Sequence, residues 1–177
     1  MFYVSELMTT PPPVFSSALQ EKVYGAFAGL GIPFVRVDTD PGITMEDCRH
    51  IDGRIGVRIV KTVFLCNRQQ TEFYLYVTMA DKPFVTRDFC AAMGGIPRVS
   101  FAPADKLWEL TGVAVGATTV LSAILPSCAP VHLVLDKEVT SAEWFACTDG
   151  TPTCFVKLRT ADLLEKYLSG HPFRVIG

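Results

Sequence analysis

Several motifs that would identify a common class of enzyme are missing from this chain of 177 residues. It contains no Cys-x-x-Cys pair, and its three histidines are far apart in sequence, so no metal-binding spacing is present. Neither a P-loop nor a Gly-x-Gly-x-x-Gly turn occurs, and no Gly-x-Ser-x-Gly elbow marks a serine hydrolase. We therefore expect no metal site and no cofactor, and no serine nucleophile.

Long hydrophobic runs and a strong net charge are missing as well. No apolar run reaches the ~18 residues that span a bilayer, and residues 1–15 lack the basic start and apolar stretch of a secretory signal. The six cysteines are scattered among apolar neighbours, which is typical of buried thiols in a reducing compartment. The net charge is −2, so no overall field attracts nucleic acid. These features predict a cytoplasmic protein with no membrane association.

The composition and the order of predicted elements indicate one mixed α/β domain. Apolar residues make up 49% of the chain and charged residues 19%, as in ordinary globular proteins. Three consecutive prolines predict an extended lead-in over residues 1–14, followed by a domain over 15–177. Local patterns predict helices at 16–30, 45–50, 86–93, 103–110, 118–125 and 161–168. They predict strands at 34–38, 57–66, 72–79, 98–101, 131–135, 154–158 and 173–176. Hairpins mixed with strand–helix alternation favour a mixed, mostly antiparallel sheet with packed helices.

Lys61 stands in the middle of an otherwise apolar, β-branched strand pattern. Lysine is almost never fully buried unless it is paired. Its side chain therefore either points out of the sheet to solvent or points into a pocket that uses its charge. The segment alone favours the outward orientation.

Basic residues are concentrated between positions 49 and 68. This stretch contains Arg49, Arg54, Arg58, Lys61 and Arg68, and a single acid, Asp52. Such a patch can bind phosphates, or it can be an ordinary solvated surface.

The order of several segments carries a family resemblance. The segments are Lys61–Leu65, Phe73–Val77, Arg98–Ala102, Leu107–Val113, Gly116–Thr119, Val131–Asp136 and Thr151–Thr153. This series resembles the YbaK/prolyl-tRNA-synthetase-associated editing domain family over about residues 15 to 177. The branch it resembles most is that of the free-standing alanyl-tRNA(Pro) deacylases (ProX/PrdX-like).

The resemblance implies a YbaK-like fold and hydrolysis of the ester that joins a wrong amino acid to the terminal adenosine of tRNA(Pro). The implied partners are the acceptor end of tRNA(Pro) and prolyl-tRNA synthetase, with this chain acting in trans or fused to it. Lys61 and Gly116 are the implied catalytic residues. The implied substrate-binding residues are Thr62, Ala117, Thr118, Thr119, Val120, Gly150 and Thr151. We assign tRNA binding to Arg49, Arg54, Arg58 and Arg68.

The chain departs from the family pattern at four of its positions. Thr62 stands where asparagine is common, and Val120 replaces the proline of the glycine-rich loop. Ala146 and Gly150 stand at the histidine and asparagine of a later motif, of which Thr151 is retained. These departures leave two interpretations open: a diverged enzyme with altered pocket polarity, or a tRNA-binding or synthetase-associated module with weakened catalysis.

The expected chemistry is undemanding because an aminoacyl ester is already activated. It needs a positioned water and groups that stabilise negative charge on the carbonyl oxygen. Lys61 can hold a phosphate or ester oxygen as a cation, or act as a base if desolvation lowers its pKa; we favour the cation. Gly116 permits close backbone approach, so the amides of residues 116–118 could donate to the oxyanion. Cysteine catalysis with His132 is disfavoured by the apolar neighbours of the thiols.

The substrate class follows from what a proline-activating pocket cannot reject. A missing methylene lowers the discrimination free energy of such a pocket by only ~1–3 kcal/mol, so alanine, which is smaller than proline, also enters it. A second, smaller pocket can then hydrolyse the alanine from the tRNA. Alanine is the expected amino acid, with cysteine and serine as near-isosteric competitors. A general hydrolase of small esters is a third interpretation, disfavoured by the few acids and histidines of catalytic type.

Overall fold

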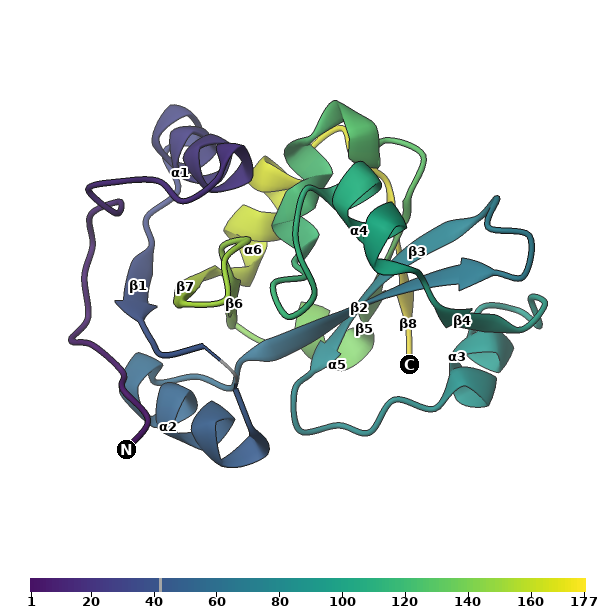
Figure 1. Ribbon diagram of the computed structural model, residues 1–177, viewed down its shortest axis with the longest axis horizontal. Coiled ribbons are helices and arrows are strands. Elements are labelled where there is room, and N and C mark those ends of the chain that lie inside the picture. Colours follow the sequence, from purple (N-terminus) through teal and green to yellow (C-terminus); the bar gives the residue numbers. More distant parts are fainter. Residues whose placement is uncertain (42) are drawn as a thin grey trace.

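Two sheets organise the protein, one of five strands and one of three (Figure 1). The computed structural model describes residues 1–41 and 43–177. The helices are α1 (Ala18–Leu30), α2 (Met45–Ile55), α3 (Thr86–Ala92), α4 (Ala104–Thr111), α5 (Lys137–Thr140) and α6 (Thr160–Asp162), with 3-10 turns η1 (Val120–Ile124) and η2 (Pro126–Cys128) and a π turn, η3 (Leu163–Tyr167). The strands are β1 (Val35–Asp38), β2 (Val60–Asn67), β3 (Phe73–Met79), β4 (Val99–Phe101), β5 (His132–Asp136), β6 (Trp144–Thr148), β7 (Cys154–Arg159) and β8 (Phe173–Ile176).

The larger sheet has the strand order β4-β2-β3-β5-β8. Strands β4, β2 and β3 pair antiparallel, whereas β5 pairs parallel with both β3 and β8. The smaller sheet, in the order β1-β7-β6, is antiparallel throughout. The predicted fold class, a mixed and mostly antiparallel α/β domain, is confirmed.

Helices α1 and α2 begin at side-chain caps that the sequence indicates. The hydroxyl of Ser17 accepts a hydrogen bond from the amide of Gln20 at 3.0 Å, and α1 ends at Gly31 in the left-handed region. Thr44 forms a capping box with Asp47 at the start of α2. This helix extends to Ile55, five residues beyond its predicted end, because Ile51 and Ile55 are both buried in an apolar cluster beneath it.

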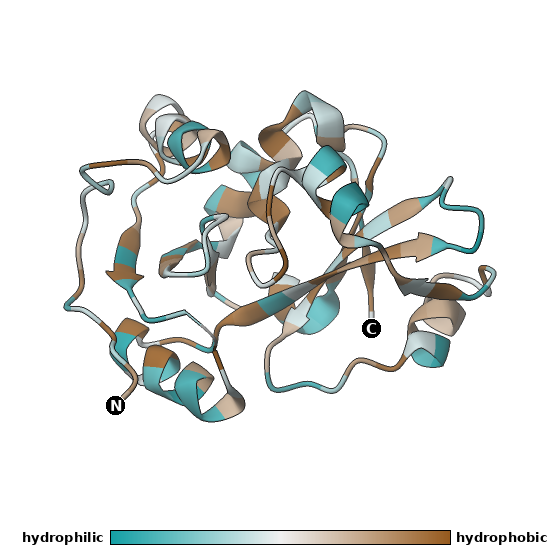
Figure 2. Cartoon of the chain, in the orientation of Figure 1, coloured by the Kyte–Doolittle hydropathy of each residue, from teal (hydrophilic) through white to brown (hydrophobic). Residues whose placement is uncertain are grey.

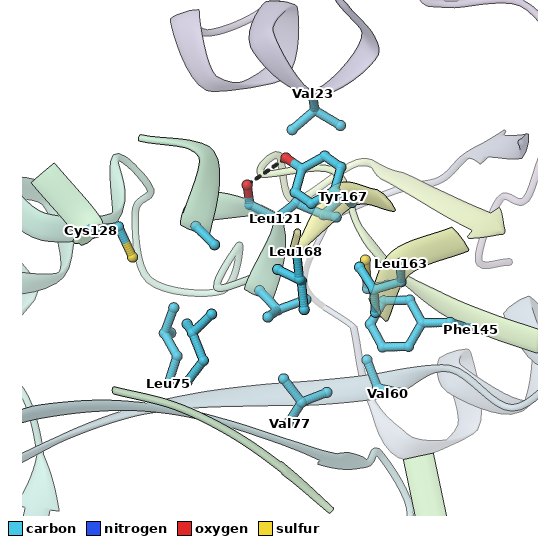
Figure 3. Packing of buried hydrophobic residues seen from close by; sticks show 14 of the residues in the cluster. Val23, Val60, Leu75, Val77, Leu121, Cys128, Phe145, Leu163, Tyr167 and Leu168 are labelled. Atoms are coloured by element: carbon cyan, nitrogen blue, oxygen red, sulfur yellow. Dashed lines mark hydrogen bonds between the residues drawn. The ribbon is translucent and has the colours of Figure 1, made fainter. Parts of the chain in front are cut away.

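The main core lies between one face of the larger sheet and the elements that cover it (Figure 3). Val60, Leu75 and Val77 project from the sheet toward Leu121 and Leu163. The apolar segments are thus concentrated inside the molecule, while the turn between β2 and β3 is hydrophilic (Figure 2). A second cluster, which includes Phe89 of α3, covers the opposite face of the same sheet. Both faces of β2 and β3 are therefore packed, as their nearly continuous apolar sequences require.

Some predicted elements differ in the structure. The helix expected at 118–125 is a 3-10 turn, and the helix expected at 161–168 begins at Thr160 and becomes a π turn. Strand β6 and the short helix α5 were not predicted. The N-terminal segment forms isolated bridges to β1 and its flank through Val4 and Met8. Within the described ranges, no helix is both long enough and apolar enough to cross a bilayer.

Candidate functional site

A cavity of about 230 Å³ lies where the start of β2 meets α2, the loop before η1, and strands β6 and β7. Four residues predicted from the sequence line it: Lys61, Thr62, Gly116 and Thr118. Its other walls include Cys48, Ile59, Ala80, Cys147, Thr148 and Phe155. Lys61 and Gly116 belong to two family motifs and are 55 residues apart in the sequence. In the structure both line the same cavity.

The open wall of this cavity results from incomplete strand pairing. β2 pairs with β3 from Val60 to Cys66, but β4 covers its other edge only from Leu65 to Asn67. The first residues of β2 therefore have a free edge, and these are the residues that line the cavity.

Lys61 lies on the opposite face of β2 from Thr62, because side chains alternate along a strand. Thr62 lies on the face that carries Val60 and Phe64 into the main core, and Lys61 is the cross-strand partner of Thr78. The Lys61 ammonium donates a hydrogen bond to the main-chain carbonyl of Lys82, in the loop after β3. That carbonyl belongs to a residue outside the lining of the cavity, so the ammonium is anchored beside the hollow.

The environment of Lys61 shifts its titration. Burial lowers the pKa of Lys61, and the nearby charge of Asp81 and the thiol of Cys48 oppose this shift. The side chain is half-buried. It lines the cavity, while its ammonium is bonded to the Lys82 carbonyl outside the lining.

The loop around Gly116 provides unpaired backbone donors. Gly116 has φ of 93°, in the left-handed region, and a Cβ placed on it would meet no atom within 4 Å. The amide of Ala117 is already bonded to the carbonyl of Ala114 at 3.1 Å. Among the described residues, the amides of Gly116 and Thr118 have no hydrogen-bond acceptor. Two of the three amides proposed from the sequence are therefore unpaired, and that of Ala117 is not.

Three further residues of this loop are turned into the protein. Ala117, Thr119 and Val120 are buried, and none of them lines the cavity. The Thr119 hydroxyl accepts from the amide of Leu121 at 3.2 Å and lies 3.6 Å from the sulfur of Cys147. Their placement indicates that they support the cavity wall from behind.

Gly150 and Thr151 belong to a different arrangement, centred on the buried carboxylate of Asp149. This carboxylate accepts hydrogen bonds from Gln20 Nε2 at 2.9 Å and Tyr24 OH at 2.7 Å, both on α1. It also accepts from the Thr151 amide at 3.1 Å and hydroxyl at 2.7 Å. Gly150 has φ of 97°, and a Cβ there would lie 2.8 Å from Leu19 Cδ2. These residues fasten the loop after β6 to α1, a role that no local pattern in the sequence signals.

The cysteines of the cavity are poor nucleophiles. Burial raises the pKa of Cys147 to about 12, and burial together with Asp52 and Asp47 raises the pKa of Cys48. His132 is exposed, outside this cavity, with its ring bonded to Glu72 at 2.6 Å. The Cys–His alternative therefore has no geometric support. The sequence did not predict either cysteine as a lining residue. It gave no signal for β6, which carries Cys147, and it did not show which side of α2, which carries Cys48, faces the cavity.

The basic stretch does not form one patch. Arg49 and Arg54 are exposed on α2, whereas Arg58 forms ion pairs with Asp81 at 2.6 Å and Glu138 at 2.9 Å. Arg68 lies in the turn after β2, about 23 Å along the strand direction from Lys61 at ~3.3 Å per residue. The basic stretch is therefore divided, because the β2–β3 hairpin, whose turn contains Arg68, runs away from α2 (Figure 1).

The chemical groups at the cavity suit an attack by water on an activated carbonyl. No histidine, aspartate or glutamate is among the described residues that line it. Its polar groups are the Lys61 side chain, the hydroxyls of Thr62, Thr118 and Thr148, and the two unpaired amides. Such groups can stabilise an oxyanion and position a water molecule.

Known proteins resemble this chain over most of its length. Residues 39–166 match the model of the aminoacyl-tRNA editing domain family. The chain is 27% identical over 149 residues to the prolyl-tRNA editing protein ProX of Acetoanaerobium sticklandii, covering 83% of this chain and 90% of that protein.

Solved structures share the fold. A protein proposed to be a trans-editing enzyme for prolyl-tRNA synthetase superposes with a TM-score of 0.64 at 18% identity, covering 92% of this chain and 98% of its own. The hypothetical protein APE2540 superposes with a TM-score of 0.66 at 22% identity, covering 88% and 98%. At these identities the likeness shows the fold alone.

Proposed function

Because the chain belongs to the aminoacyl-tRNA editing domain family, we propose that it hydrolyses the ester of alanyl-tRNA(Pro) as a step of translation quality control. The observation that carries this proposal is the convergence of Lys61, Thr62, Gly116 and Thr118 on one small cavity. The similarity to the prolyl-tRNA editing protein ProX supports tRNA(Pro) as the substrate and prolyl-tRNA synthetase as the enzyme whose errors are corrected.

The size of the cavity supports a small amino acid. At about 230 Å³ it is below the ~300–1,000 Å³ typical of pockets for drug-sized ligands. Thr62, Thr118 and Phe155 limit its width from three different elements. A cavity of this size suits a small amino acid. In this proposal the proline ring is excluded by steric contact with the cavity walls, and not by the volume itself, so the correct product is spared.

The reaction needs a water molecule as the nucleophile. The water oxygen bonds to the ester carbonyl carbon, and the resulting oxyanion receives hydrogen bonds from the amides of Gly116 and Thr118. The ester C–O bond then breaks, the ribose oxygen of the terminal adenosine takes up the proton that the attacking water gives up, and alanine and free tRNA result. In this scheme Lys61 acts as a cation beside the oxyanion or the terminal phosphate. Lys61 donates a hydrogen bond to a carbonyl oxygen, and the negative charge of Asp81 raises the pKa of Lys61. Both features support a cation over a neutral base.

A tRNA-binding module with weakened catalysis is the second candidate. It is favoured by the lack of an acid or histidine among the described lining residues and by Ala146, which is buried in the cluster under α2. This arrangement leaves the position of the family histidine without any polar group.

Deacylation of alanyl-, cysteinyl-, seryl- and prolyl-tRNA(Pro) by the wild-type chain distinguishes the candidates. We expect alanine to be released fastest and proline to be retained, with Lys61→Ala as the inactive control. Binding of tRNA without hydrolysis of any of the four esters would favour the module. Rapid release of proline would contradict steric exclusion.

A further inference from the structure

A groove runs along β4, the strand at the edge of the larger sheet that is farthest from β8. One hollow of about 540 Å³ is lined by Arg68, Arg98, Asn67, Ser100 and Phe101, among others. A neighbouring hollow of about 490 Å³ is lined by Arg87 and again by Arg98. Because Arg98 lines both, the two form one continuous surface, which we call the β4 groove.

The charge of the β4 groove has one sign. Arg68, Arg87 and Arg98 are exposed, and none has an ion-pair partner among residues 1–41 and 43–177. No acid is among the described residues that line either hollow. Of the acids close in sequence, Glu72 is paired with His132 and Asp88 lines a separate cavity beside Lys82. Three uncompensated guanidinium groups in one groove suit phosphate groups, which arginine binds in a bidentate manner.

An exposed aromatic ring lies in the same groove. Phe101 is 65% exposed although it is a large apolar residue, and one side of its ring is supported by Phe84 at a centroid distance of 5.9 Å. Exposed aromatic rings beside positive charge are typical of surfaces that bind single-stranded nucleic acid, because every base has a face that can stack.

β2 connects the β4 groove to the candidate active site. Lys61 lies at the start of this strand, Phe101 pairs with Leu65, and Asn67 ends it. At ~3.3 Å per residue, Phe101 lies about 13 Å and Asn67 about 20 Å from Lys61 along the strand direction. The aromatic ring is thus nearer the cavity, and the arginines Arg68 and Arg98 are farther away.

We infer that the β4 groove binds the acceptor end of tRNA, with a base of the single-stranded 3′ end against Phe101 and backbone phosphates on Arg68, Arg87 and Arg98. This inference rests on the proposed function, because it assumes that the terminal ester occupies the cavity at Lys61. It assigns the main phosphate contacts to a surface that the sequence did not reveal, since Arg87 and Arg98 lie outside the basic stretch 49–68.

The inference is tested by measuring the binding of a tRNA(Pro) acceptor minihelix that carries no amino acid. Fluorescence anisotropy at several salt concentrations reports this binding. The double variant Arg68→Gln/Arg98→Gln should weaken binding at least about tenfold and reduce the log–log salt slope by ~0.7–0.9 per lost contact. Phe101→Ala should weaken binding of the intact minihelix. It should leave unchanged the binding of a minihelix that lacks its single-stranded end. The matched control is Arg174→Gln on β8, at the opposite edge of the same sheet. It should leave binding unchanged, and thermal melting should show that all variants are folded.

The outcomes separate this inference from the proposed function. Unchanged binding in the double variant, or equal weakening in the Arg174 control, would overturn the β4 groove as the tRNA site. If the double variant bound the minihelix normally but lost binding to prolyl-tRNA synthetase, the groove would be a protein-docking surface and the inference would be wrong. If the wild type released no amino acid yet the groove variants still weakened binding, the proposed hydrolysis would fail and the inference would stand.

Discussion

Replacing Thr151 by valine distinguishes a substrate-binding residue from one that stabilises the loop after β6. The family resemblance assigns Thr151 to substrate binding, whereas the structure buries its hydroxyl against Asp149 Oδ1 at 2.7 Å. Valine has nearly the same shape and removes only the hydroxyl donor. The bond from the Thr151 amide to the same carboxylate, at 3.1 Å, is kept.

The expected cost follows from the environment of Asp149. Its carboxylate is fully buried, and no cation is paired with it among the described residues. A hydrogen bond to a charged group contributes about 1.5–3 kcal/mol. Three other donors remain and a buried methyl group offsets part of the loss, so we expect destabilisation of about 1–2 kcal/mol. For a chain of this length that corresponds to a fall in melting temperature of about 2–8 °C.

Urea and thermal unfolding measure this cost, and deacylation of alanyl-tRNA(Pro) measures function. The control is Thr153→Val in the same loop, whose half-buried hydroxyl has no hydrogen bond in the described structure; its effect should be below about 0.5 kcal/mol. We expect Thr151→Val to lower stability while kcat/KM below the melting range changes little. Unchanged stability with a tenfold lower kcat/KM would refute the structural role and restore substrate binding.

Four further predictions concern the cavity and the basic residues. Lys61→Ala should lower kcat/KM at least about tenfold without loss of folding, and near wild-type turnover would remove the lysine from the mechanism. Because burial lowers the pKa of Lys61 and the cation is the active form, deacylation should decline with rising pH earlier than a free lysine would predict. Lys61→Arg, if active, should move that decline to higher pH. Gly116→Val should abolish alanine release but keep tRNA binding. The reason is that φ of 93° disfavours a β-branched residue and that the valine side chain would fill open space. Unchanged hydrolysis would place the aminoacyl site elsewhere. Arg54→Gln should weaken minihelix binding and flatten its salt dependence more than Arg58→Gln, because two ion pairs already compensate Arg58. An equal effect of the two variants would contradict that reasoning.

The sequence by itself determined most of the regular elements. The alternation and β-branched residues of 57–66 and 72–79 predicted the central hairpin, and the glycine at position 31 predicted the end of α1. Such signals depend on neighbouring residues only, so they can be interpreted without a fold. The order of segments was enough to predict the fold class and to single out Lys61 and Gly116.

Tertiary contacts decided what the local patterns could not. Five small residues from 116 to 120 are similar in sequence terms, yet only Gly116 and Thr118 line the cavity. Asp149 accepts from α1, more than a hundred residues away in sequence, and this contact turns Thr151 from an expected substrate contact into part of a structural cluster.

The distribution of charge was decided in the same way. Arg58 is neutralised by partners 23 and 80 residues distant in sequence, and the β2–β3 hairpin separates Arg68 from α2. The same hairpin places Arg68 near Arg98, the residue before edge strand β4, and the two line one groove. The partners of a charged side chain are set by chain crossings and strand register, which the local sequence does not encode.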